Sequence, residues 1–226
     1  MALAKRVSFL VVLVVLISVR SGRADDLFNN LTTPPSSSAD PVGFIGPLAD
    51  SFSTGSSSFV FDSLTLGLSD MSSSFGLPPC SGVCTMTVSL LSDSSTSPGN
   101  TIEMLGSVND SSLSGAPTNM TFDTFKPVNL QPNTRYWIEL TSNDPSNDPF
   151  GSWWSFSGGI NNGEFFSNIN GVTPDTGGPY QMKVSGVSGS ASVPEPSAFS
   201  LLFVGLAVVG FFATIRRKHQ ACANVL

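Results

Sequence analysis

The sequence predicts an all-β protein, an antiparallel β-sandwich of the jelly-roll type, with an N-terminal signal peptide and one C-terminal transmembrane helix. Short runs of alternating apolar and polar residues recur through the middle of the chain. Gly, Pro, Asn, Asp and Ser separate these runs, as turns do. The same region has no convincing helical periodicity. Two packed sheets bury one face of each strand, so alternation favours the sandwich.

The N-terminus has the order of a secretory signal peptide. Two basic residues precede an apolar run over residues 7–19, and small residues follow it. Small side chains stand at the −3 and −1 positions for cleavage after Ala24, so residues 1–24 are expected to direct the chain to the Sec export machinery and then be removed. Arg20 and Arg23 lie close to the apolar run, which leaves an uncleaved N-terminal anchor as the alternative.

Composition divides the exported part into three pieces. Residues 25–43 are rich in Thr, Pro and Ser and are expected to form a flexible lead. Residues 44–184 hold the alternating runs, and their length fits one sandwich domain. Residues 185–192 are mostly Gly, Ser and Val and are expected to be a linker.

Seven or more short strands are expected in the sandwich domain. Three of the runs alternate clearly and four alternate more weakly. The clear runs cover residues 59–68, 84–90 and 134–140, and the weaker runs cover 102–108, 120–125, 153–157 and 180–184.

The C-terminus carries three features in a fixed order. A Pro-Glu-Pro motif comes first, then the uncharged apolar run 198–215, then three basic residues. At about 1.5 Å per residue, a helix over this run is near the lower limit for spanning a hydrocarbon core. Proline cannot lie inside a helix, and the basic residues are expected on the cytoplasmic side with residues 219–226 as a tail. The signal residues are Val193, Pro194, Glu195, Pro196, Arg216, Arg217 and Lys218.

This arrangement resembles the PEP-CTERM sorting signal of bacterial exported proteins, over residues 193–218. The resemblance implies an exosortase, a membrane-embedded transpeptidase-like enzyme, as the partner that recognises the signal and cleaves near it. One alternative is an ordinary membrane anchor with an accidental Pro-Glu-Pro. Another is a eukaryotic lipid-anchor signal, which the polar residues after the apolar run disfavour.

The exported domain resembles the choice-of-anchor R family of bacterial exported domains over residues 50–184. The likeness lies in the order of three segments: residues 50–55 leading into 59–68, residues 88–93 with 97–99, and residues 130–140 followed by 153–156. Family members carry one of several surface anchors after the domain. The biochemical role of the family is undefined, so the resemblance implies architecture and address only.

Charge and histidine content exclude several functions. Residues 25–195 hold all sixteen acidic residues and only three basic ones, a net charge of −13 that repels nucleic acid. The single histidine, His219, follows the apolar run, so the exported part lacks a Ser-His-Asp triad and histidine metal ligands. We therefore expect no enzyme activity and no cofactor. A hydrolase that uses two carboxylates is the less favoured alternative.

Two cysteines in the exported part lie close together. Cys80 and Cys84 are expected to form a local disulfide in an oxidising compartment.

Two sets of residues are candidates for ligand binding. Oxygen donors after the third clear strand are weak calcium candidates, although the same residue types are usual in turns. These are Asn143, Asp144, Asn147 and Asp148. Five aromatic residues are candidates for stacking on sugar rings, with one of each adjacent pair expected in the core. The alternative, which we favour, is that these aromatic residues are structural. They are Tyr136, Trp137, Trp153, Trp154 and Tyr180.

Together these observations predict an exported, non-enzymatic envelope protein. The membrane, through its C-terminal helix, and an exosortase are its expected partners, with extracellular polysaccharide or biofilm matrix as the expected ligand. The competing interpretation is a structural envelope protein without a ligand.

Overall fold

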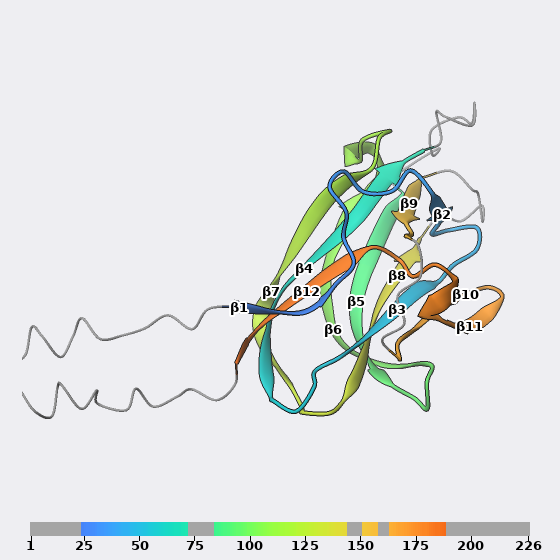
Figure 1. Cartoon of the computed structure of the whole chain (residues 1–226). Helices are drawn as coiled ribbons and strands as arrows, with labels where there is room; N and C mark the ends of the chain where they lie inside the picture. Colours follow the sequence, from blue (N-terminus) through green and yellow to red (C-terminus); the bar gives the residue numbers. More distant parts are fainter. Residues whose placement is uncertain (1–23, 72–83, 144–150, 158–162, 189–226) are drawn as a thin grey trace, which may run out of the picture. The chain divides into compact units, whose positions relative to one another are not determined.

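The computed structural model describes residues 24–71, 84–143, 151–157 and 163–188 (Figure 1). In these ranges twelve strands form two six-stranded sheets, and all their pairings are antiparallel. The first sheet, sheet A, contains β1 (Ala24–Asn29), β2 (Ala39–Pro41), β4 (Phe59–Asp70), β7 (Thr118–Leu130), β9 (Ser152–Ser155) and β12 (Met182–Ser188). The second, sheet B, contains β3 (Leu48–Ser53), β5 (Thr85–Asp93), β6 (Pro98–Asn109), β8 (Arg135–Ser142), β10 (Phe165–Asn168) and β11 (Gly171–Pro174).

The all-β prediction and its two antiparallel sheets are confirmed. Each of the seven runs of alternating residues overlaps a strand of the structure. The described ranges also contain two short 3-10 turns, Asp110–Ser112 and Asp175–Gly177. No helix within these ranges is long and apolar enough to cross a membrane. The expected span 198–215 and all but the last residue of the signal peptide lie outside the described residues.

Strand β4 organises sheet A because it has partners along both edges. One edge pairs with β7. The other pairs with β12 from Phe59 to Leu66 and then with β9 from Leu68 to Asp70. Strand β1 lies outside β12, and β2 lies outside β9. The long alternating run at residues 59–68 is therefore the centre of the sheet.

The core lies between the two sheets. The inward side chains of β4 are fully buried and belong to one apolar cluster with inward residues of β5, β8 and β12. The fully buried members from these strands are Leu64, Leu66, Leu68, Met86, Val88, Leu90, Ile138, Leu140, Met182 and Val184. Burying a side chain of this size contributes about 1.5–3 kcal/mol, so the sandwich interior is the main source of stability.

Sheet B is also buried over part of its outer face. Ala49, Leu91 and Trp137 form a second buried cluster there, and Phe165 packs against it. Strands β3 and β8 are consequently buried on both faces, and residues 48–53 are buried at five of six positions. This explains why β3 shows no clear alternation in the sequence.

The expected flexible lead at residues 25–43 is wrong, because both of its ends enter sheet A. Strand β1 pairs with β12, and Phe28 lies in the core at 7% exposure. Asn30 continues the attachment: its side-chain amide donates to the Tyr180 carbonyl at 2.8 Å, and its side-chain oxygen accepts from the Met182 amide at 2.6 Å. Polar composition does not prevent an edge strand, since one side of such a strand faces water.

The expected linker at residues 185–192 is also partly wrong. Strand β12 continues to Ser188 and stays paired with β4 over its whole length. The folded unit therefore runs at least from Ala24 to Ser188.

Replacing Phe28 by Ala tests whether the N-terminal lead belongs to the fold. We expect Phe28→Ala to lower the free energy of unfolding by about 3–5 kcal/mol, as for other buried Phe residues. Asp25→Ala on the same strand is the control, because Asp25 is exposed. Urea denaturation of both variants measures the effect, and equal stabilities would restore the flexible-lead interpretation.

Candidate functional site

A shallow, open groove of about 200 Å³ lies where β2, β9 and β10 come together. Its lining is mixed, with two aromatic rings, one carboxylate, one amide and one glycine, all half-buried. The lining residues are Asp40, Phe156, Phe166, Asn168 and Gly178.

Tyr180 holds these residues together from beneath. Its ring stacks on Trp154, with centroids 4.7 Å apart, and meets the edge of Phe166 at 5.8 Å. Its hydroxyl donates a hydrogen bond to Oδ2 of Asp40 at 2.8 Å. Tyr180 is 1% exposed, so it fixes the position of Asp40 without occupying the groove.

The Tyr180–Asp40 bond also sets which of the two groups is ionised. Burial raises the pKa of Asp40, and the hydrogen bond from Tyr180 opposes part of that rise. Burial, and then the nearby Asp40 charge, raise the pKa of Tyr180 far above its usual range. The tyrosine hydroxyl therefore remains a donor and Asp40 remains the acceptor at neutral pH.

Phe156 is placed by backbone contacts on both sides. Its amide donates to the Ser38 carbonyl at 2.9 Å, and it forms an isolated bridge with Tyr180. Gly178 passes close to its ring with a left-handed φ of 115°. A side chain at this position would be strained, so glycine suits the turn.

Asn168 occupies the last position of β10. Its side-chain oxygen accepts from the Asn170 amide at 2.9 Å, which fixes the side chain at the hairpin turn. The NH₂ group of the same side chain donates towards the Tyr180 hydroxyl, which opposes part of the rise in the pKa of Tyr180, and its second N–H can serve a ligand. The groove thus offers apolar rings, one carboxylate acceptor and one amide donor.

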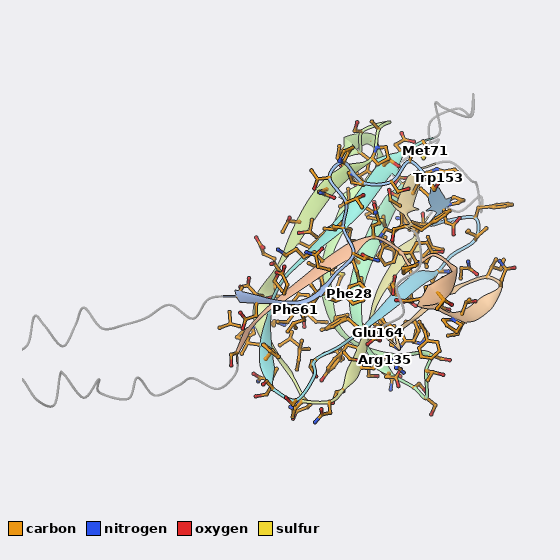
Figure 2. The ribbon with its side chains drawn as sticks, viewed as in Figure 1. Phe28, Phe61, Met71, Arg135, Trp153 and Glu164 are labelled. Carbon is orange, nitrogen blue, oxygen red and sulfur yellow. The ribbon has the colours of Figure 1, made fainter. Side chains whose placement is uncertain are left out.

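A buried cluster of carboxylates lies at the base of the β10–β11 hairpin. Asp50, Glu164 and Asp175 are 0%, 5% and 1% exposed. Glu164 is satisfied, because its Oε2 accepts from Ser51 Oγ at 2.6 Å and from Arg135 Nε at 3.1 Å. Figure 2 shows Arg135 and Glu164 lying beside each other. Among the described residues, the carboxylate oxygens of Asp50 and Asp175 have no hydrogen-bond donor in bonding geometry.

Burial and mutual repulsion shift the ionisation of this cluster. Desolvation, and then the Glu164 charge, raise the pKa of Asp175 to about 7, although Arg135 opposes this. Desolvation, and then Asp175, raise the pKa of Asp50 well above its usual range. The nearby amides of Tyr180 and Ser51 offset only part of that rise. Strongly shifted groups of this kind cluster at functional sites.

The stacking role considered for five aromatic residues is wrong, and their alternative structural role is confirmed because all five are buried. The five candidates, Tyr136, Trp137, Trp153, Trp154 and Tyr180, are all at most 8% exposed. The members of each adjacent pair do lie on opposite faces, but the face expected to be open is covered. Phe165 packs over the cluster that contains Trp137, whose Nε1 donates to Asp93 at 2.8 Å.

The calcium candidates are only partly described. Asn143 uses its side-chain oxygen to accept from the Thr85 amide at 2.7 Å, so it acts as a turn residue. Asp144, Asn147 and Asp148 lie outside the described residues. Within the part of the chain that the structure describes, no group of three His, Cys, Asp or Glu residues is arranged to hold a metal ion.

Only one of the two cysteines predicted to form a disulfide lies in the described part of the chain. Cys84 is disulfide-bonded. Cys80 lies outside the described residues, so its pairing with Cys84 stays a prediction.

The sequence did not reveal the residues that line the groove. They come from separate elements at positions 40, 156, 166, 168 and 178, and no spacing along the chain joins them. The carboxylate cluster was missed for the same reason. A single acidic residue within an apolar strand, Asp50 between Leu48 and Phe52, was the only local signal.

Replacing Tyr180 by Phe tests the support of Asp40. We expect Tyr180→Phe to raise the pKa of Asp40 further, because the bond that favours its charged form is lost. The free energy of unfolding should fall by about 1–2 kcal/mol. Titration of the Asp40 carboxyl by NMR measures the pKa. Tyr136→Phe is the control, since the Tyr136 hydroxyl accepts from the Gln131 amide instead. An unchanged Asp40 titration would contradict the assignment.

Comparison with known proteins identifies the C-terminal segment. Residues 192–218 match the PEP-CTERM protein-sorting motif, which confirms the resemblance found at the C-terminus. No curated protein matches the chain. The motif indicates an exported, envelope-associated protein that an exosortase-type enzyme processes.

Proposed function

We propose that this chain is a non-enzymatic component of the cell surface or extracellular matrix that holds extracellular polysaccharide in its groove. The sorting motif at residues 192–218 is the observation that carries the proposal, because it indicates the cellular location of the protein. The choice-of-anchor R resemblance is consistent with it, as that family combines one exported domain with an interchangeable anchor. An exosortase then acts on the C-terminal segment after export.

The chemistry of the groove supports a sugar ligand. A sugar ring has apolar C–H faces and a rim of hydroxyl groups, so it suits a site with aromatic rings and a few polar groups. Phe156 and Phe166 supply the rings, Asp40 an acceptor and Asn168 a donor. Pockets for drug-sized ligands have volumes of roughly 300–1,000 Å³. A groove of about 200 Å³ suits one ring of a longer polymer.

The charge of the domain restricts the class of polysaccharide. Residues 25–195 carry a net charge of −13, and Asp40 adds a carboxylate within the groove itself. Like charges across an interface are repelled. We therefore expect a neutral or amine-bearing polymer and no binding to a polyuronate.

Two other functions are less well supported. A carboxylate-based hydrolase needs two carboxyl groups about 5–10 Å apart in one cleft. Among the described residues that line the groove, Asp40 is the single carboxyl group. A structural envelope protein without a ligand would share the fold and the address, and only a binding measurement separates it from the proposal.

The intact mass of the protein from the envelope and medium of the producing cell tests the address. We expect cleavage after Ala24 and again near Pro194-Glu195-Pro196. Replacement of Pro196 by Ala should leave the C-terminal segment attached, whereas the control Ser190→Ala should be processed normally. A wild-type protein that keeps residues 198–226 would be a permanent membrane protein, and the proposed exosortase processing would fail.

Binding of the full-length chain in detergent to immobilised polysaccharides tests the groove. The probes are the extracellular polysaccharide of the producing cell, a neutral glucan, chitosan and a polyuronate. Asp40→Asn and Asn168→Ala should each weaken binding roughly tenfold, as expected when one hydrogen bond to a ligand is lost. Asp123→Asn is the control, because Asp123 is exposed on β7. Absence of binding to all four probes would favour the structural interpretation.

A further inference from the structure

The β10–β11 hairpin has few backbone bonds to the rest of sheet B. Strand β10 pairs with β3 at only two positions, Phe166 with Asp50 and Ser167 with Ala49. Strand β11 pairs only with β10. The position of the hairpin must therefore depend on side chains, and most of those that hold it lie at its base.

Glu164, Arg135 and Ser51 make the contacts at that base. Ser51 Oγ donates to Glu164 and accepts from the Phe165 amide at 2.9 Å. Arg135 donates to Glu164 Oε2 and, at 2.8 Å, to the Gly163 carbonyl, and its guanidinium lies 4.8 Å from the Phe165 ring centroid. The Asp175 amide donates to the Glu164 carbonyl at 3.1 Å and closes the hairpin.

The charges at the base do not balance when all the carboxylates are ionised. Asp50, Glu164 and Asp175 are all buried. Arg135 pairs with Glu164 and also acts on Asp175, whereas no cation of the described residues acts on Asp50. Tyr180, which precedes β12, acts on Asp50 and stays neutral, and its hydroxyl is bonded to Asp40. Glu139 on β8, paired with Ala49, is a further acid on the strand beside β3. Buried charges without partners cost several kcal/mol each, so Asp50 and Asp175 need neutralisation.

We propose that Asp50, Glu164 and Asp175 form a proton-operated latch, which holds the β10–β11 hairpin against β3 at mildly acidic pH and loosens it as pH rises towards neutrality. Below the transition, Asp50 and Asp175 are neutral and Arg135 balances Glu164. Above it, the negative charges of Asp50 and Asp175 are added beside the Glu164–Arg135 ion pair. Opening the base of the hairpin then exposes the carboxylates to water and relieves their repulsion.

The latch bears on the groove because the hairpin forms one of its walls. Phe166 and Asn168 both belong to β10 and line the groove. This part of the inference rests on the proposed polysaccharide binding and names its regulation. A groove with a loosened wall should bind its ligand more weakly at pH 8 than at pH 5.

The direction of the pH dependence follows from linkage. A carboxyl with a raised pKa in the folded state keeps its proton while the open state has lost it. For Asp175, the stability of the closed hairpin therefore falls as pH rises from 3.8, the ordinary pKa of an aspartate, to about 7, its pKa in the folded state. Below and above this window, Asp175 makes the stability of the hairpin independent of pH. One such proton raises the opening equilibrium about tenfold for each pH unit inside that window.

Hydrogen exchange of the hairpin amides, corrected for intrinsic exchange rates, tests the latch without any ligand. In the full-length chain in detergent, we expect protection of residues 165–174 to fall between pH 4.5 and 6.5 by about tenfold per pH unit for each carboxyl that loses its proton on opening, Asp175 alone or Asp175 with Asp50. Asp175→Asn, which cannot ionise, should reduce or remove this slope. The exposed control Asp123→Asn should keep it. The wild-type pH series stands by itself if the Asp175 variant does not fold.

Three results would overturn the latch. Protection that does not change with pH in the wild-type chain would be one, and an equal slope in Asp175→Asn would be another. The third is protection at pH 8 that calcium restores and a chelator removes, because a cation would then be the neutralising partner. Since exchange is measured without polysaccharide, the latch can fail while the groove still binds, and the groove can fail while the latch holds.

Discussion

The stacking of Tyr180 on Trp154 is the contact on which both the core and the groove depend. Trp154 is fully buried, and its indole N–H donates to the Gln181 carbonyl at 3.0 Å, which ties β9 to the start of β12. The stacked ring places the tyrosine hydroxyl at Asp40 and its edge at Phe166. Residues from both sheets therefore take their positions from one aromatic pair, so the groove is a continuation of the core.

The same region contains the least favourable feature of the fold. Asp50 alternates with Leu48 and Phe52, whose side chains belong to the core, so its carboxyl group points into the sandwich. An ionised carboxylate without a partner in such a place costs several kcal/mol. Folded domains have a net stability of only about 5–15 kcal/mol, and two such charges would consume much of it. The carboxyls at Asp50 and Asp175 persist because a proton can remove the charge.

The sequence was informative where one face of a strand is buried and the other meets water. The runs at residues 59–68 and 134–140 predicted β4 and β8 in this way. It was uninformative for β3, which is buried on both faces, and for β10 and β11, whose four-residue lengths are too short to show a period. The aromatic residues misled for a related reason, since the outer layer over Trp137 is built by a distant residue, Phe165. A contact between residues so far apart in the chain arises from the tertiary fold, and the pattern of a single sequence does not predict it.

The pairing of β1 with β12 brings the two ends of the folded unit together, away from the groove. Ala24 pairs with Val187, so the first and last described strands meet at one end of the sandwich (Figure 1). Met182, at the start of β12, follows Tyr180 and Gln181 beneath the groove. Six further residues reach Ser188, a distance of about 20 Å at the usual rise per residue in a strand. The proposed cleavages, after Ala24 and near Pro194, would remove no residue that lines the groove, because the lining residues all lie between Asp40 and Gly178 in the sequence.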